Sequence, residues 1–262
     1  MAKISRDRRG ISESIVSVIL FAIVITTSIS ALFYAQLNLS TQSGQTDFEN
    51  AKASMINLAQ TIEGLSLSGK GTAAYVRIAS KTGGVWLTRG EEKIKITVGG
   101  ETREYDVNLV RFRSDVSSVD FQVFKGLSDS DPTRCLIVSP DSSAPLGWVY
   151  LKRSQGAWII VDFGRVRIVP TGRVRVNENN YFLVDVTYVE IVRGAFGGSD
   201  TYNICAKVKD VKVETIYADP SSTSIIVERG GFSETYPIDT GGEVQAILVF
   251  LNIVEVEVST GG

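Results

Sequence analysis

The sequence predicts an α+β fold, with one long N-terminal α-helix followed by a large antiparallel β-sandwich. Ile15 to Tyr34 form an apolar stretch inside a run without charges from Ser14 to Thr46, and about 20 such residues suffice for a helix to span a bilayer. From residue 66 onward, short runs rich in Val, Ile, Tyr and Phe alternate apolar with polar side chains between Gly and Pro turns, which is typical of strands. We expect about a dozen strands in an immunoglobulin-like layout.

The composition argues against an enzyme. The 262 residues include no histidine, which removes the commonest general base, the Ser-His and Cys-His nucleophile pairs and most zinc sites. The net charge is -2 and Lys and Arg are scattered, so no footprint for nucleic acid is present. We therefore expect a protein without catalytic residues, cofactor, metal or nucleic-acid partner.

The residues before the apolar run are mainly basic. Four cations and one acid precede Gly10: Lys3, Arg6, Arg8, Arg9 and Asp7. By the positive-inside rule, this end of the chain stays on the cytoplasmic side. An ordinary cleaved secretory signal fits poorly, because Phe33 and Tyr34 stand where the cleavage site needs small side chains.

The junction "RRGISES" places a basic pair and a glycine directly before the first apolar residue. It resembles the class III prepilin signal of archaeal type IV pilins and archaellins, which a membrane peptidase cuts on the cytoplasmic side after the glycine. The resemblance covers about the first quarter of the chain and implies cleavage between Gly10 and Ile11, with residues 1–10 removed. The alternative is an uncleaved membrane anchor with Gly10 at its boundary.

Cleavage at this junction would leave a free ammonium group on Ile11, and an unpaired charge beside apolar helices is costly. Glu13 is the acidic residue within reach. Many bacterial type IV pilins carry a glutamate at the fifth mature position, whereas here that position is Ile15 and the acid is third. We expect Glu13 to pair with the ammonium group; the alternative is a carboxylate in the membrane interface.

The apolar segment carries small residues at four-residue spacing. They form two lines: Ala22, Thr26 and Ser30, and Thr27, Ala31 and Ala35. Such lines let helices approach closely in lipid, although Thr and Ser also bond to their own backbone carbonyls. Just beyond, Asn38-Leu39-Ser40 forms an N-glycosylation sequon.

The helical pattern continues past the length of a membrane. A second face repeats at three- and four-residue steps: Phe48, Ala51, Met55, Ala59 and Ile62. Thr46 and Glu49 match a capping box, so either a new helix begins there or one helix runs through Gly44. A continuous helix over residues 11–65 is about 80 Å long. It suits a filament subunit, with its lower half packed on neighbouring subunits and its upper half under a head of residues 66–262; an anchor with a short stalk is the alternative.

Several features of the β-rich part are specific enough to test. Gly99-Gly100 is a good two-residue hairpin turn, and the run 244–254 reads as a central strand buried on both faces. Cys135 and Cys205 either form a disulfide or remain two buried thiols. Asp129 and Asp131 are better explained by a solvated turn than by calcium, so we expect no metal.

The resemblance implies a structural subunit of a surface filament, a homopolymer held together by its N-terminal helices and used for adhesion. Its partners would be a prepilin peptidase, an assembly ATPase and a membrane platform protein. The precursor would sit in the cell membrane and the filament outside the cell. Two alternatives stay open: an archaellin of the swimming filament, and a membrane-anchored β-sandwich binding module that does not polymerise.

Overall fold

The computed structural model describes residues 7–79, 83–90, 92–114, 122–123, 135–140, 144–195, 201–221 and 224–261. For residues 7–14, 79, 122–123, 201–202 and 261 it describes the backbone alone. The chain forms two compact units, Met1–Thr46 and Asp47–Gly262. We call the second unit the head.

One helix, α1, runs from Asp7 to Leu65 without interruption, so it passes through Gly44 and no second helix begins at Thr46. The Thr46 hydroxyl donates to the Gln42 carbonyl at 2.9 Å, the bond of a residue inside a helix rather than of an N-cap. Gly44 costs about 1 kcal/mol relative to alanine, less than the cost of breaking a turn of backbone hydrogen bonds. The residues from Asp47 to Leu65 belong to the head.

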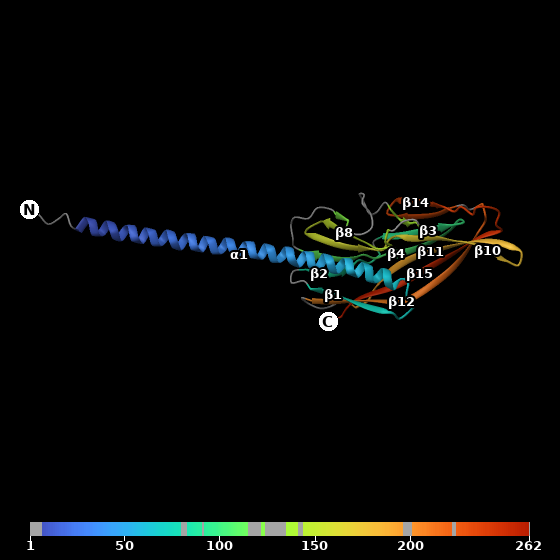
Figure 1. Cartoon of the computed structure of the whole chain (residues 1–262), viewed down its shortest axis with the longest axis horizontal. Coiled ribbons are helices and arrows are strands. Elements are labelled where there is room, and N and C mark those ends of the chain that lie inside the picture. Colours follow the sequence, from blue (N-terminus) through green and yellow to red (C-terminus); the bar gives the residue numbers. More distant parts are fainter. Residues whose placement is uncertain are drawn as a thin grey trace, which may run out of the picture. The chain divides into compact units, whose positions relative to one another are not determined.

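The described strands form three mostly antiparallel sheets (Figure 1). The six-stranded sheet has the order β1 (Ala73–Ala79), β12 (Thr201–Ala218), β15 (Ala246–Gly261), β11 (Asn179–Arg193), β10 (Val166–Val176), β7 (Ile137–Val138). The four-stranded sheet has the order β14 (Phe232–Pro237), β13 (Ser224–Arg229), β3 (Glu92–Val98), β4 (Glu101–Val107). The five-stranded sheet has the order β2 (Gly84–Leu87), β5 (Val110–Ser114), β9 (Ala157–Asp162), β8 (Trp148–Arg153), β6 (Gln122–Val123).

Two strand pairs depart from the antiparallel expectation. β11 runs parallel to β15 over thirteen register positions, from Tyr181 opposite Ala246 to Arg193 opposite Val258, and β10 runs parallel to β7. Parallel neighbours need a long crossover, and here the chain returns through β12, β13 and β14 before it reaches β15. The α+β class and the predominance of antiparallel strands are confirmed.

The predicted hairpin turn between β3 and β4 is confirmed. Val98 pairs with Glu101, and the two residues between them have φ angles of 57° at Gly99 and 85° at Gly100. Both angles lie in the left-handed region, which glycine enters without the steric cost that a side chain would bring.

A second turn of the same kind joins β13 to a strand that the sequence pattern did not predict. Gly230 and Gly231, with φ angles of 56° and 84°, connect Arg229 to Phe232. The strand β14 was missed because "FSETYP" is short and largely polar, and its burial pattern shows no fully buried residue. The Gly230-Gly231 pair is the one feature of this sequence that indicates a hairpin turn before β14.

The six-stranded sheet is buried on one face along part of its length and on the opposite face along the rest. In β15, the odd-numbered residues from Ile247 to Ile253 belong to the core shared with the four-stranded sheet. The even-numbered Val254, Val256 and Val258 belong to the core that contains α1. The strand begins at Ala246 and is central in its sheet, as predicted, but the prediction that it is buried on both faces is wrong, because Leu248, Phe250 and Asn252 are only partly buried.

The head part of α1 supplies one wall of that second core. The predicted amphipathic face is confirmed, because its five members are 0–5% exposed: Phe48, Ala51, Met55, Ala59 and Ile62. Leu58 and Leu65, which the prediction did not include, are buried with them. Glu63 secures the end of the helix, since its Oε1 accepts hydrogen bonds from the Leu146 backbone N–H at 2.9 Å and from Arg167 Nη2 at 3.1 Å.

Candidate functional site

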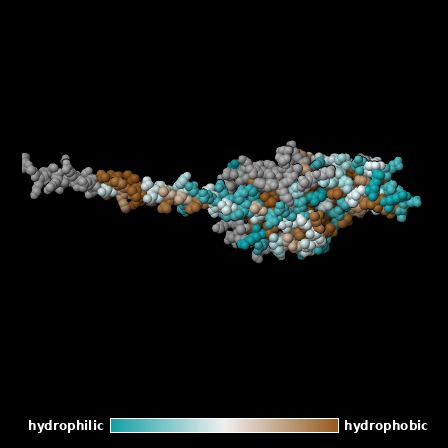
Figure 2. All heavy atoms as spheres, in the orientation of Figure 1, coloured by the Kyte–Doolittle hydropathy of each residue, from teal (hydrophilic) through white to brown (hydrophobic). Residues whose placement is uncertain are grey.

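The apolar segment of α1 is the most distinctive surface of the first unit. Every residue from 15 to 43 is exposed, and the large apolar side chains among them are between 43% and 70% exposed. Figure 2 shows apolar surface in brown on this part of the helix. The exposed large apolar residues are Ile15, Val16, Val18, Ile19, Leu20, Phe21, Ile23, Val24, Ile25, Ile29, Leu32, Phe33, Tyr34, Leu37 and Leu39. By length and composition this helix can cross a membrane.

The hydroxyl groups in the two lines of small residues donate to backbone carbonyls of the same helix. Thr26 donates to the Ala22 carbonyl at 2.8 Å, Ser30 donates to the Thr26 carbonyl at 2.8 Å, and Thr27 donates to the Ile23 carbonyl at 2.9 Å. These three side chains are thus satisfied within the helix, which lowers the cost of placing them in lipid or in a helix–helix contact. The two lines of small residues, completed by Ala31 and Ala35, therefore stay available for close packing.

The predicted cleavage junction lies inside α1. The backbone is helical from Asp7, so Gly10 and Ile11 occupy its first turns, and Glu13 follows in the next. The side chains of these residues are outside the described part of the structure. Cleavage after Gly10 and pairing of Glu13 with the new amino group stay predictions.

The sequon is exposed on the surface of the helix. Asn38 is solvent-exposed, and the Ser40 hydroxyl donates to the Leu37 carbonyl at 2.9 Å. The segment 38–45, for which the sequence pattern allowed a linker, is helical throughout. Glycosylation of Asn38 stays a prediction.

The disulfide that the sequence allowed is not formed: Cys135 and Cys205 are both free and partly buried. Cys205 lies in β12, whereas Cys135 directly precedes β7, four strand spacings away in the same sheet. At about 4.8 Å per spacing the two strands are about 19 Å apart. Since a disulfide needs Cα atoms within about 7 Å, this pair cannot form one within the chain. The sulfhydryl of Cys135 donates to the Ile137 carbonyl at 3.5 Å.

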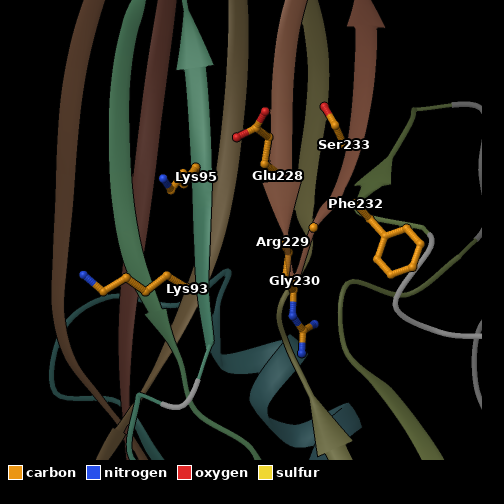
Figure 3. Close-up of a pocket in the computed structure, with 8 residues that line it drawn as sticks. Lys93, Lys95, Glu228, Arg229, Gly230, Phe232 and Ser233 are labelled. Atoms are coloured by element: carbon orange, nitrogen blue, oxygen red, sulfur yellow. The ribbon is translucent and has the colours of Figure 1, made fainter.

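A pocket of about 270 Å³ lies at the β13–β14 turn, lined by Lys93, Lys95, Glu228, Arg229, Gly230, Gly231, Phe232 and Ser233 (Figure 3). Its cations are already compensated. Lys93 and Lys95 both contact Glu104, at 3.3 and 3.0 Å, and these contacts hold the pKa of Glu104 below its usual value. Arg229 pairs with Glu92 and Asp162. Each of the three cations that line the pocket therefore already contacts a carboxylate.

The described residues contain no group of three or more His, Cys, Asp or Glu side chains that could hold a metal ion. Asp129 and Asp131, for which we expected a solvated turn, lie outside the described residues. No constellation of nucleophile and base comes together in the part of the chain that the structure describes.

Two neighbouring tryptophans were missed by sequence reasoning: Trp86 is exposed, and Trp158 is partly buried. Trp86 and Trp158 come from β2 and β9, and their ring centroids are 5.8 Å apart. The alternation in "GVWL" places Trp86 on the face opposite Val85 and Leu87, and this was the signal available. The contact with Trp158 depends on strand order, which no local pattern contains.

Comparison with known proteins adds no family to this description. No family model matches the chain, and no match was found among curated proteins or among solved structures.

Proposed function

We propose that this protein is the structural subunit of an archaeal type IV pilus-like surface filament, and that it polymerises through the apolar segment of α1. The observation that carries the proposal is the exposure of every residue from 15 to 43, in a helix that continues without a break into the core of the head. No residue in the described part of the chain covers that segment. It must lie in lipid, against other helices, or in each of them in turn.

The two halves of α1 have different roles. The half that ends at Leu65 contributes its apolar face to the core of the head. The half that begins near Ile15 is uncharged, and its small residues allow neighbouring helices to approach closely. Transfer from lipid into a bundle of like helices would then be driven by van der Waals packing, because lipid supplies no hydrophobic drive of its own.

On this proposal the precursor waits in the membrane, a prepilin peptidase removes residues 1–10, and an assembly ATPase with a membrane platform protein builds the polymer. The head faces the exterior and serves adhesion. We also propose that the strands of the head form an immunoglobulin-like sandwich. An archaellin of the swimming filament, or a membrane-anchored module that does not polymerise, would carry the same kind of helix.

Two measurements on the native material test the proposal. Mass spectrometry of the mature chain should give Ile11 as its first residue, and electron microscopy of sheared surface material should show filaments that contain this chain. A mature chain beginning at Met1 or Ala2, together with the absence of filaments, would contradict it. Filaments that rotate during swimming would instead identify an archaellin.

Variants of the helix then test the mechanism. Ala31→Leu should reduce the filament yield strongly while the head stays folded, because the added side chain keeps neighbouring backbones apart. Leu20→Ile is the matched control, since it conserves volume, and should assemble normally. Glu13→Ala should impair assembly and leave folding unchanged; a normal filament yield from this variant would remove Glu13 from the mechanism.

A further inference from the structure

One corner of the five-stranded sheet brings together two indoles and two cations from four strands. The register places Gly84, Arg113, Trp158 and Lys152 in one row across β2, β5, β9 and β8. In the next row, which begins at Val85, all four residues are buried in the core that contains α1. Side chains alternate between faces along a strand, so the row of Arg113 lies on the opposite face.

Gly84 shapes this corner. A β-carbon at Gly84 would lie 2.8 Å from the ring of Trp86, so the indole of Trp86 folds back over the Gly84 backbone. This position brings Trp86 against Trp158 and leaves it 48% exposed. Trp158 is held in turn, because its Nε1 donates to the Ser154 carbonyl at 2.6 Å. The two rings are therefore positioned before any ligand arrives.

The cations flank the rings. The Arg113 guanidinium lies 5.8 Å from the centre of the Trp158 ring, and Lys152 is the neighbour of Trp158 on the other side. Both side chains are exposed, and neither forms an ion pair with any residue in the described ranges. This differs from the pocket at the β13–β14 turn, where both lysines contact Glu104.

We propose that Trp86, Trp158, Arg113 and Lys152 form a binding site for an acidic polysaccharide. A sugar ring has an apolar face of C–H groups that stacks on an indole, and Trp86 presents such a surface because it is 48% exposed. Carboxylate or sulfate groups on the same chain match Arg113, which binds such groups through a rigid fork of donors, and Lys152, which binds them as a point charge. Neutral glycans would lack the contacts of their acidic groups with Arg113 and Lys152.

This inference rests on the proposed function, since it names the class of ligand that an adhesive head would bind. The site nevertheless functions without polymerisation. It can therefore be tested on the unassembled full chain in detergent, where failure to bind says nothing about filaments and failure to form filaments says nothing about binding.

Titration calorimetry with an oligogalacturonate tests the site, with a maltooligosaccharide of equal length as the neutral comparison. The wild-type chain should bind the acidic oligosaccharide, more weakly as salt is added, and should bind the neutral one at least about tenfold more weakly. Trp86→Ala should weaken binding by about fivefold to tenfold. The double variant Arg113→Gln/Lys152→Gln should bind both oligosaccharides equally, because only the stacking contacts remain.

Gly84→Ala is the geometric test. Its β-carbon displaces the Trp86 ring while every ligand-contacting side chain is retained, so binding should fall towards that of Trp86→Ala. Lys95→Gln, at the compensated pocket, is the matched control and should bind like the wild type. The proposal is overturned if the wild type does not bind the oligogalacturonate, if Trp86→Ala binds it equally well, or if single-stranded oligothymidylate binds more tightly.

Discussion

The carboxylate of Asp162 and the guanidinium of Arg229 form a two-pronged ion pair inside the head. Arg229 Nη1 lies 3.0 Å from Asp162 Oδ1, and Nη2 lies 2.9 Å from Oδ2. Both residues are buried, and they join β9 of the five-stranded sheet to β13 of the four-stranded sheet. Asp162 also accepts the Gly164 N–H at 2.7 Å, so the ion pair fixes the turn that follows β9.

Arg229→Met should destabilise the head severely. The substitution leaves Asp162 as a buried charge without its partner, and such losses cost about 3–5 kcal/mol. Denaturation of the full chain in detergent, followed by tryptophan fluorescence, measures the loss. Arg103→Gln is the control, because Arg103 and its partner Glu214 are both about 40% exposed, and the loss of stability there should be much smaller. An equal loss of stability in the two variants would contradict the conclusion that the buried ion pair of Asp162 and Arg229 stabilises the head more than the exposed pair does.

Arg165→Met should behave in the opposite way to Arg229→Met. Arg165 is fully buried, its guanidinium stacks 3.9 Å from the centre of the Trp148 ring, and its Nε and Nη2 have no hydrogen-bond partner among the described residues. Burial lowers the pKa of Arg165, because loss of solvent disfavours the charged guanidinium. An apolar side chain of similar length removes this cost, so the same denaturation assay should show unchanged or increased stability. A loss above about 3 kcal/mol would mean that the charge is needed.

A matched pair of truncations separates the two halves of α1. Leu58 is fully buried in the head, so Leu58→Ala should cost about 2–5 kcal/mol of head stability. Leu39 is 67% exposed, so Leu39→Ala should change head stability by less than about 0.5 kcal/mol. Leu39→Ala should lower the filament yield even though the head stays folded, because it removes packing between neighbouring helices. An effect of Leu39→Ala on unfolding would show that this part of the helix contributes to the fold of the single chain.

Local sequence patterns predict the helix and one of the hairpins of this protein. The uncharged run after Ser14 predicts the first half of α1. The apolar residues that recur every three or four positions from Phe48 predict the second half, because such a repeat places them on one face of a helix. The Gly99-Gly100 turn likewise predicts its hairpin. The continuity of the helix at Gly44 was undecided, because the cost of one glycine is close to the gain from a cap.

Pairing between distant strands lies beyond such patterns. Nothing near Tyr181 in the sequence indicates that it lies opposite Ala246, or that Cys135 and Cys205 lie four strands apart. The site formed by Trp86 and Trp158 depends on the same long-range order, because β2 reaches β9 only through β5. The helix could therefore be predicted from sequence, whereas the binding corner of the head required the strand order.

Glu190 gives the head a pH dependence of defined sign. It lies in β11 directly opposite Glu255 of β15, and burial, then Glu255, then Asp106 raise its pKa above the usual value, against smaller opposing effects of Lys212 and Lys209. The folded state therefore holds the proton of Glu190 more tightly than the unfolded state, and stability falls as pH rises through the interval between the two pKa values.

Glu190→Gln removes this effect, so the variant should be more stable than the wild type at pH 7. The difference should shrink as pH falls and vanish below about pH 4, where Glu190 is protonated in both states. The unfolding free energy of the wild type and the variant, measured across this range, gives the difference directly and cancels the opposite trend of Glu104, whose pKa is lowered. A wild type more stable than the variant at pH 7 would mean that Lys212, which also pairs with Glu255, stabilises the ionised Glu190 instead.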